Sequence, residues 1–440
     1  MGNGLLRRNR DSLLRRNRDS LLRRNRDFSL FWAGQSISVV GTQVTAVALP
    51  LVATLTLHSG PAGVSVVATA SYLPNVLLPL FVGHWLERRR RRPVMIAADV
   101  LRAATLAVVP LAYLFGSLSV PLLAGVAFVV GAASVVFDVG SFAYLPSLVE
   151  SEDLAAANRA SQGSITVAQV GGPGLAGVLV QAVGAPTAIV VDAVSYLGSA
   201  VGISAARRPE PPPPDASAAR PSILSGLRIV LGNPYLRALT AHAAGYNAAY
   251  QILMVNLVVY ALAERGAAPG LYGLALTAGG VGAFLGAMMA LRLVARSGYG
   301  HAFIVTVVFS AGVPLIIVTI PLAGPAFAVA LGACLLISGL GVGSANVLSV
   351  TLRQLAVPRD SLARSNGAYR LLIYGVMPFG SVLGGVVGQA LGPRAGVGIG
   401  TAGMALSAIP MVVGRIRALR DPADAQAPPA EQPRVLDQTR

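Results

Sequence analysis

Long apolar runs alternate with short polar breaks along most of this chain. About twelve of these runs are long enough to cross a bilayer, which requires about 20 residues of helix. Turn-forming residues mark the breaks, for example His58-Ser59-Gly60-Pro61 and Gly392-Pro393. The pattern therefore predicts an all-α polytopic membrane protein. Its predicted spans are 30–57, 62–86, 93–115, 119–145, 160–183, 186–206, 236–262, 269–294, 301–323, 325–350, 365–391 and 394–415.

The composition supports this class and argues against several others. The 440 residues are 54% hydrophobic and 12% charged, about half the charged fraction of a typical soluble protein. A net charge of +16 would favour nucleic-acid binding in a soluble protein, but here the arginines follow the ends of the spans, so we expect no nucleic-acid partner. The chain has no lysine to complete a phosphate-binding loop, and Cys334 is its single cysteine. We expect no enzyme activity, no cofactor and no metal site.

The positions of the arginines predict the topology. If both termini are cytoplasmic, only Arg265 and Arg394 fall on outer loops, which leaves 32 of the 34 basic residues on the inner side. Basic residues accumulate in cytoplasmic loops of membrane proteins. We therefore predict a multi-pass protein of the cytoplasmic (inner) membrane, with both termini in the cytoplasm. The stretch 83–93, which holds five consecutive arginines, then faces the cytoplasm.

The chain also divides into segments of different composition. A basic segment opens it and repeats Ser-Leu-Leu-Arg-Arg-Asn-Arg-Asp, which fits either a duplicated tail or a segment lying on anionic lipid. A Pro-rich stretch predicts an extended linker that ends in a short surface helix at Ser222–Leu231. The predicted order is 1–29 basic cytoplasmic segment, 30–206 first six-helix bundle, 207–235 cytoplasmic linker, 236–415 second six-helix bundle and 416–440 disordered cytoplasmic tail.

The two bundles share sequence at a shift of 208 residues. The matches are Leu154/Leu362, Asn158/Asn366, Ala160/Ala368, Gly172/Gly380, Gly177/Gly385, Gln181/Gln389, Ala182/Ala390 and Gly184/Gly392. The matched segments begin spans five and eleven, so both halves run the same way across the membrane. Two parallel six-helix pseudo-repeats predict a binding site near the midplane, between the halves.

Several stretches resemble the major facilitator superfamily. Gly83, Arg88, Arg91 and Arg92 fit the loop signature of that superfamily, with Glu87 in place of the usual Asp. The stretches 31–38, 98–103 and 145–158 look like its drug and siderophore exporter branch. Gly172, Pro173 and Gly177 are similar to the span-five motif of its antiporters.

The resemblance implies a role for the loop at residues 83–93. It implies a cytoplasmic latch, in which Gly83 lets helices approach, Glu87 lies near a helix N-terminus and Arg88 or Arg91 pairs with Asp138. The alternative is that the arginines only hold the loop inside.

Acidic residues within spans are few, and they are the candidates for proton coupling. They are Asp99, Asp138 and Asp192, all in the first half. Asp99 precedes Arg102 by three residues, so we also expect these two to pair on one helix face. Asp192 is the first candidate, with a hydrogen-bonded helix end as the alternative.

Polar and aromatic residues on apolar helices are the candidates for substrate contacts, although each also fits helix packing. They are Gln35, Ser38, Thr42, Tyr72, Asn75, His242, Tyr246, Asn247, Tyr250, Gln251, Asn346 and Tyr374. By resemblance, we expect a monomeric secondary transporter in the lipid bilayer. It is expected to export a small organic molecule (drug, antibiotic, siderophore or other metabolite) in exchange for protons, as in multidrug efflux. A proton-coupled importer on the same fold is the alternative, and a non-transporting membrane sensor or scaffold is a third possibility.

Overall fold

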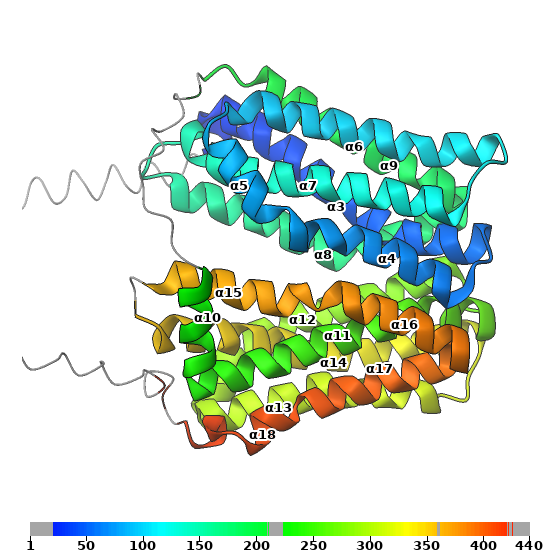
Figure 1. Cartoon of the computed structure of the whole chain (residues 1–440), viewed down its shortest axis with the longest axis vertical. Coiled ribbons are helices and arrows are strands. Elements are labelled where there is room, and N and C mark those ends of the chain that lie inside the picture. The colour runs from blue at the N-terminus through cyan, green and yellow to red at the C-terminus, as the bar shows by residue number, and fades with distance from the viewer. Residues whose placement is uncertain are drawn as a thin grey trace, which may run out of the picture. The chain divides into compact units, whose positions relative to one another are not determined.

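The structure, a computed structural model, describes residues 21–208, 210, 223–358, 361–419, 421 and 425. All regular elements among these residues are helices (Figure 1). This confirms the predicted all-α polytopic fold. The basic repeat before residue 21, residues 209 and 211–222 of the predicted linker and the tail beyond residue 425 lie outside the described residues.

The chain forms two compact units. The first contains Met1–Ser217 and Ala268–Leu274, and the second contains Ala218–Ala267 and Ala275–Arg440. The helices of the first unit are α2 (Leu21–Arg24), α3 (Arg26–Leu51) with a π-helical turn (Val52–Thr56), α4 (Gly60–Leu77), α5 (Pro79–Glu87), α6 (Arg91–Leu114), α7 (Val120–Leu148), α8 (Leu154–Val183) and α9 (Ala185–Ala205).

The second unit has the same kind of construction. Its helices are α10 (Ile223–Gly232), α11 (Pro234–Val259) with a π-helical turn (Tyr260–Glu264), α12 (Pro269–Ser297, whose first turns are grouped with the first unit), α13 (Tyr299–Gly312) with a 3-10 turn (Val313–Thr319), α14 (Gly324–Ala356), α15 (Leu362–Gly375), α16 (Met377–Leu391), α17 (Pro393–Ser407), α18 (Ile409–Val413) and a 3-10 turn (Arg415–Ala418). The short helix α10 lies where the sequence predicts one.

Eleven helices among the described residues are long and apolar enough to span a membrane. The predicted span 62–86 differs, because it is divided between α4 and α5 at Leu78. Pro79 follows this break, and a proline lacks the N–H that would continue the helical hydrogen bonds. The second predicted span is therefore two helices instead of one, and the predicted span 365–391 is likewise divided between α15 and α16 ahead of Pro378.

The shift of 208 residues extends to the helix boundaries. The asparagines Asn25 and Asn233 both cap the first long helix of their unit, with side chains that accept hydrogen bonds from backbone N–H groups of the first turn. Elements at the same shift include the two π-helical turns, the ends of α7 and α14 at Leu148 and Ala356, the starts of α8 and α15, and the ends of α8 and α16. The internal repeat is thus structural, and it reaches well beyond the segment in which the residues match.

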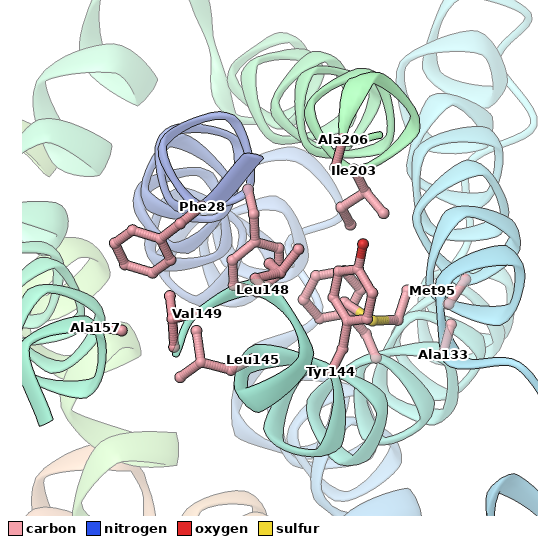
Figure 2. Close-up of a cluster of buried hydrophobic side chains, with 13 residues drawn as sticks. Phe28, Met95, Ala133, Tyr144, Leu145, Leu148, Val149, Ala157, Ile203 and Ala206 are labelled. Carbon is pink, nitrogen blue, oxygen red and sulfur yellow. The ribbon is translucent and has the colours of Figure 1, made fainter. Parts of the chain in front are cut away.

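A cluster of buried apolar side chains joins the helices at one end of the first unit (Figure 2). Phe28 of α3, Met95 of α6, Tyr144 of α7 and Ile203 of α9 are each at most 1% exposed. Phe31 packs edge-on to Tyr144, with 5.8 Å between ring centroids. These contacts fix the ends of α3, α6, α7 and α9 relative to one another, and so they position the polar groups farther along the same helices.

Candidate functional site: a buried charged cluster in the first unit

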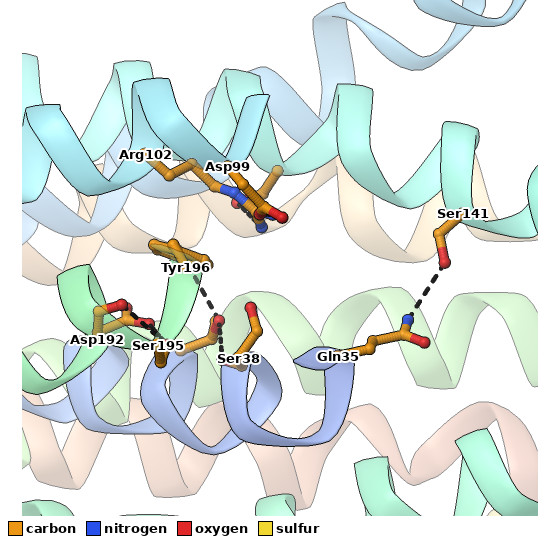
Figure 3. A network of polar contacts seen from close by, with 10 residues as sticks. Gln35, Ser38, Asp99, Arg102, Ser141, Asp192, Ser195 and Tyr196 are labelled. Carbon is orange, nitrogen blue, oxygen red and sulfur yellow. Dashed lines mark hydrogen bonds and ion pairs between the residues drawn. The ribbon is translucent and has the colours of Figure 1, made fainter. Parts of the chain in front are cut away.

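The first unit encloses a group of charged and polar side chains (Figure 3). On α6, Arg102 donates through Nη2 to Asp99 Oδ1, and both side chains are almost completely buried. This is the pair that the three-residue spacing predicts. Burying an ion pair removes two charges from water. Their mutual attraction offsets this desolvation cost only when the geometry is good and other groups complete the contacts of both side chains.

Aromatic rings on two other helices complete the surroundings of Arg102. Its guanidinium carbon lies 4.3 Å from the ring centroid of Phe137 on α7 and 4.1 Å from that of Tyr196 on α9. Such cation–π contacts are worth about 2 kcal/mol when desolvated. Phe137 and Tyr196 were not predicted as site residues, because ring contacts between distant helices leave no spacing signal in the sequence.

Asp192 on α9 has a different environment from Asp99. Its side chain is 0% exposed, and it accepts hydrogen bonds from Thr45 Oγ1 on α3 at 2.5 Å and from Ser195 Oγ at 3.0 Å. Within the described part of the chain it forms no ion pair. Asp192 is therefore a buried carboxylate held by neutral hydroxyl groups.

The candidate substrate contacts on the first span, which is α3 in the structure, pack within their own unit. Gln35 Nε2 donates to Ser141 Oγ on α7 at 3.2 Å, and the hydroxyls of Thr42 and Tyr196 lie 3.0 Å apart. Ser38 is 3% exposed on the same helix. All of these side chains contribute to packing inside the unit, and their role as substrate contacts stays a prediction.

The second unit places a row of aromatic residues along α11. The rings of His242 and Tyr246 meet edge-on at 5.9 Å, and those of Tyr246 and Tyr250 are stacked at 6.3 Å. The buried His242 hydrogen-bonds through Nδ1 to the Ser407 carbonyl at 3.0 Å. The three residues thus share one face, as their four-residue spacing predicts.

Amide side chains on α11 bind carbonyl groups of neighbouring helices. Asn247 donates to the Ile373 carbonyl at 3.0 Å, and Asn256 donates to the Gly384 carbonyl at 2.9 Å. Gln251 is 2% exposed. The other predicted contact residues are nearer the surface: Tyr72 is half-buried, and Asn75, Asn346 and Tyr374 are exposed.

The antiporter-like residues of α8 make close helix contacts. A Cβ at Gly172 would collide with the side chain of Gln43 on α3, so only glycine fits there. A Cβ at Gly177 would likewise collide with backbone atoms of Pro269 and Gly273, which belong to the same compact unit. Pro173 lies within α8, which remains one continuous helix.

The loop at residues 83–93 differs in part from the predicted latch. No heavy atom of the described residues lies within 4 Å of a Cβ built on Gly83, so no close helix approach occurs there. Glu210, which was not predicted from the sequence, is the acidic partner of Arg91. Nη1 of Arg91 lies 3.5 Å from Glu210 Oε1, and the backbone N–H of Arg91 donates to the same oxygen at 2.7 Å. Arg88 and Asp138 are both exposed, and the side chain of Glu87 lies outside the described residues. The latch remains a prediction.

Among the described residues, no group of three or more His, Cys, Asp or Glu side chains is placed to hold a metal ion. The arrangement instead offers one buried ion pair and one separate buried carboxylate, both in a bundle of apolar helices. Such intramembrane charges are costly and are characteristic of transport pathways.

Two repeated helical units with many spans and buried charges define a multi-pass membrane transporter. The chain belongs to the transmembrane secretion effector family of the major facilitator superfamily, whose model matches residues 22–439. It is 27% identical over 369 residues to the multidrug efflux pump Tap of Mycolicibacterium fortuitum, covering 81% of this chain and 87% of that protein.

Solved structures of transporters share the fold. A bacterial homologue of the iron transporter ferroportin in its inward-facing state has a TM-score of 0.71 and 18% identity, covering 90% of this chain and 99% of that one. The nucleoside transporter NupG has a TM-score of 0.67 and 12% identity, covering 88% of this chain and 96% of that one. At these identities, the likeness concerns the fold alone.

Proposed function

We propose that this chain exports a small organic molecule from the cytoplasm in exchange for protons, with Asp192 as the carboxylate that binds and releases the proton. The environment of Asp192 carries the coupling proposal. A completely buried carboxylate that is held by hydroxyl groups and forms no direct ion pair among the described residues has a high desolvation cost for its charge, so its protonation depends on the conformation around it. Asp99 is a weaker candidate, because Arg102 already neutralises it.

The direction of transport rests on the relatives. The family is described by secretion, and Tap is named a multidrug efflux pump. Export by alternating access from the inner membrane, with both termini in the cytoplasm, is consistent with the 32 arginines that this orientation places inside. The half-buried Tyr246 and Tyr250 on α11 are the aromatic surfaces that we propose for substrate contact.

Everted membrane vesicles test the direction and the coupling together. A strain that lacks its own pumps would first be screened for resistance to toxic compounds, with ethidium and acriflavine as dye probes. Vesicles with an acidic lumen should then accumulate a dye that scores in the screen, and dye addition should make the lumen less acidic. Accumulation only in right-side-out vesicles would instead establish the importer.

Asp192→Asn tests the assigned carboxylate, because asparagine keeps the hydrogen-bonding shape but does not titrate. We expect pH-driven accumulation to fall to background while dye binding remains. Glu152→Gln, at an exposed loop acid, is the matched control and should transport normally. If Asp192→Asn keeps wild-type pH-driven transport, the assignment is wrong, and Asp99→Asn and Asp138→Asn become the next variants to compare.

A further inference from the structure

The second unit contains a pocket at the place in the repeat where the first unit has its buried apolar cluster. The pocket has a volume of about 470 Å³ and lies among α10, α11, α14 and α15. Pockets for small ligands typically measure about 300–1,000 Å³. Its walls are mainly apolar, with Val230, Leu236, Val350, Val357 and Leu362 among the lining residues.

One positive group is held rigidly in this pocket. The guanidinium of Arg353 stacks 4.0 Å from the ring centroid of Tyr369, and its Nη1 donates to Asn366 Oδ1 at 2.8 Å. Within the described residues, Arg353 forms no ion pair, and its Nη2 donors have no protein acceptor. A planar guanidinium fixed in this way suits a carboxylate or phosphate.

A buried hydroxyl in the same pocket also lacks a partner. Ser365 is 5% exposed, and no described group hydrogen-bonds to its Oγ. Buried polar groups are rarely left unsatisfied, because the loss of hydration costs free energy. Ser365 lies in the first turn of α15, where backbone N–H groups also favour an anion.

Comparison with the first unit shows that the fold does not require these polar groups. At the shift of 208 residues, Arg353 corresponds to Leu145, Ser365 to Ala157 and Leu236 to Phe28. Those three residues belong to the buried apolar cluster of Figure 2. The same place in the repeat is therefore filled with apolar side chains in one unit and lined by an arginine and a serine in the other.

We propose that this pocket binds the anionic head of an amphiphile, a carboxylate or phosphate on an apolar body. Arg353 and Ser365 hold the head, and the apolar walls and the linker helix α10 enclose the body. Gly226 brings α10 against the backbone of Arg364 on α15, so a bound molecule would also tie α10 to this unit. The proposal is independent of the transport proposal, because it concerns binding alone.

Binding of dodecyl phosphate to the purified full-length protein tests this site. We expect saturable binding and a raised thermal midpoint. Arg353→Gln should weaken the affinity by about tenfold or more, because a hydrogen bond to a charged group is lost. Arg370→Gln, at an exposed arginine of α15 that does not line the pocket, is the matched control and should bind like the wild type. Equal affinity in the wild type and Arg353→Gln, or no saturable binding in the wild type, would overturn the proposal.

A second variant separates loss of binding from loss of folding. The triple variant L236F/R353L/S365A copies the packing of the first unit, so it should be as stable as the wild type and should not bind. Retained binding would contradict the assigned pocket, and inorganic phosphate that binds as tightly as dodecyl phosphate would contradict the apolar part. Competition by phosphatidylglycerol nanodiscs, with phosphatidylcholine nanodiscs as control, would identify a lipid as the natural ligand. A lack of competition would identify a soluble amphiphile. Both outcomes support the site.

Discussion

Each unit contains the same contact between two long helices, but different residues form it. We call this helix–helix contact the seam of the unit. In the first unit α3 packs on α9, and in the second α11 packs on α17 at a shift of 208 residues. Thr45 and Asp192 meet in the first seam, and Leu253 and Gly400 meet at the same place in the second. Similarly, Gly41 lies against Ser195, whereas Ala249 lies against Gly403. A larger residue on one helix is matched by a smaller residue on the other.

This difference indicates which features serve the fold and which serve another purpose. Complementary volume is retained in both seams, as close packing of helices requires. The charges are not retained, because Asp99, Arg102 and Asp192 correspond to Val307, Ser310 and Gly400. The repeat therefore folds without these charges, and this supports the assignment of proton coupling to the first unit.

The largest expected effect comes from breaking the ion pair on one side. Arg102→Ser introduces the residue found in the second unit, but it leaves Asp99 buried and uncompensated. We expect a loss of about 3–5 kcal/mol in the free energy of unfolding, measured by unfolding in mixed micelles.

The double variant D99V/R102S is the control, because it installs both residues of the second unit. It should recover most of the lost stability, since replacing both members of a buried pair is often neutral. If the single and double variants are equally unstable, the ion pair is not what compensates the buried charges of α6.

A smaller effect is expected from the volume match between α3 and α9. Gly41→Ala places a Cβ against Ser195 and Asp192 and should destabilise the protein by about 1–3 kcal/mol. G41A/S195G copies the Ala249–Gly403 contact and should restore the thermal midpoint. Failure of this rescue would show that the two seams are not equivalent in packing.

The sequence predicts the helices well and their contacts poorly. Apolar length and turn residues predicted the spans closely, but three of them are divided in the structure: 62–86 before Pro79, 365–391 before Pro378 and 394–415 before Pro410. The Asp99–Arg102 pair was predictable, because both residues lie within one turn of one helix. The Thr45–Asp192 and Arg91–Glu210 contacts were not, because they join distant segments and depend on how helices pack. In the sequence, the repeat was visible only where identical residues recur. At the seams the residues differ, and only the summed volume of the two contacting side chains is retained.

In the second unit, a hydrogen bond between neutral groups links two helices, and we expect its loss to destabilise the protein less than loss of the ion pair. Asn256→Ala removes the hydrogen bond to the Gly384 carbonyl, which links α11 to α16. We expect a loss of about 1 kcal/mol in micelle unfolding, typical of such bonds between membrane helices. Asn75→Ala is the matched control, because Asn75 is exposed and donates to the Ser71 carbonyl within its own helix α4. Equal losses in the two variants would remove any special role for the α11–α16 bond.

The smallest effect is expected at the titratable residue of the second seam. His242 corresponds to Gly34, as Ser407 corresponds to Ser199, so a histidine fills space that the first seam closes with glycine. His242→Asn keeps a donor for the Ser407 carbonyl and should leave the pH profile of dye transport in everted vesicles unchanged. Asp192→Asn should abolish pH-driven transport in the same assay. A shifted pH profile in His242→Asn would show that the second unit also takes part in proton coupling, and the division of roles between the two units would then be wrong.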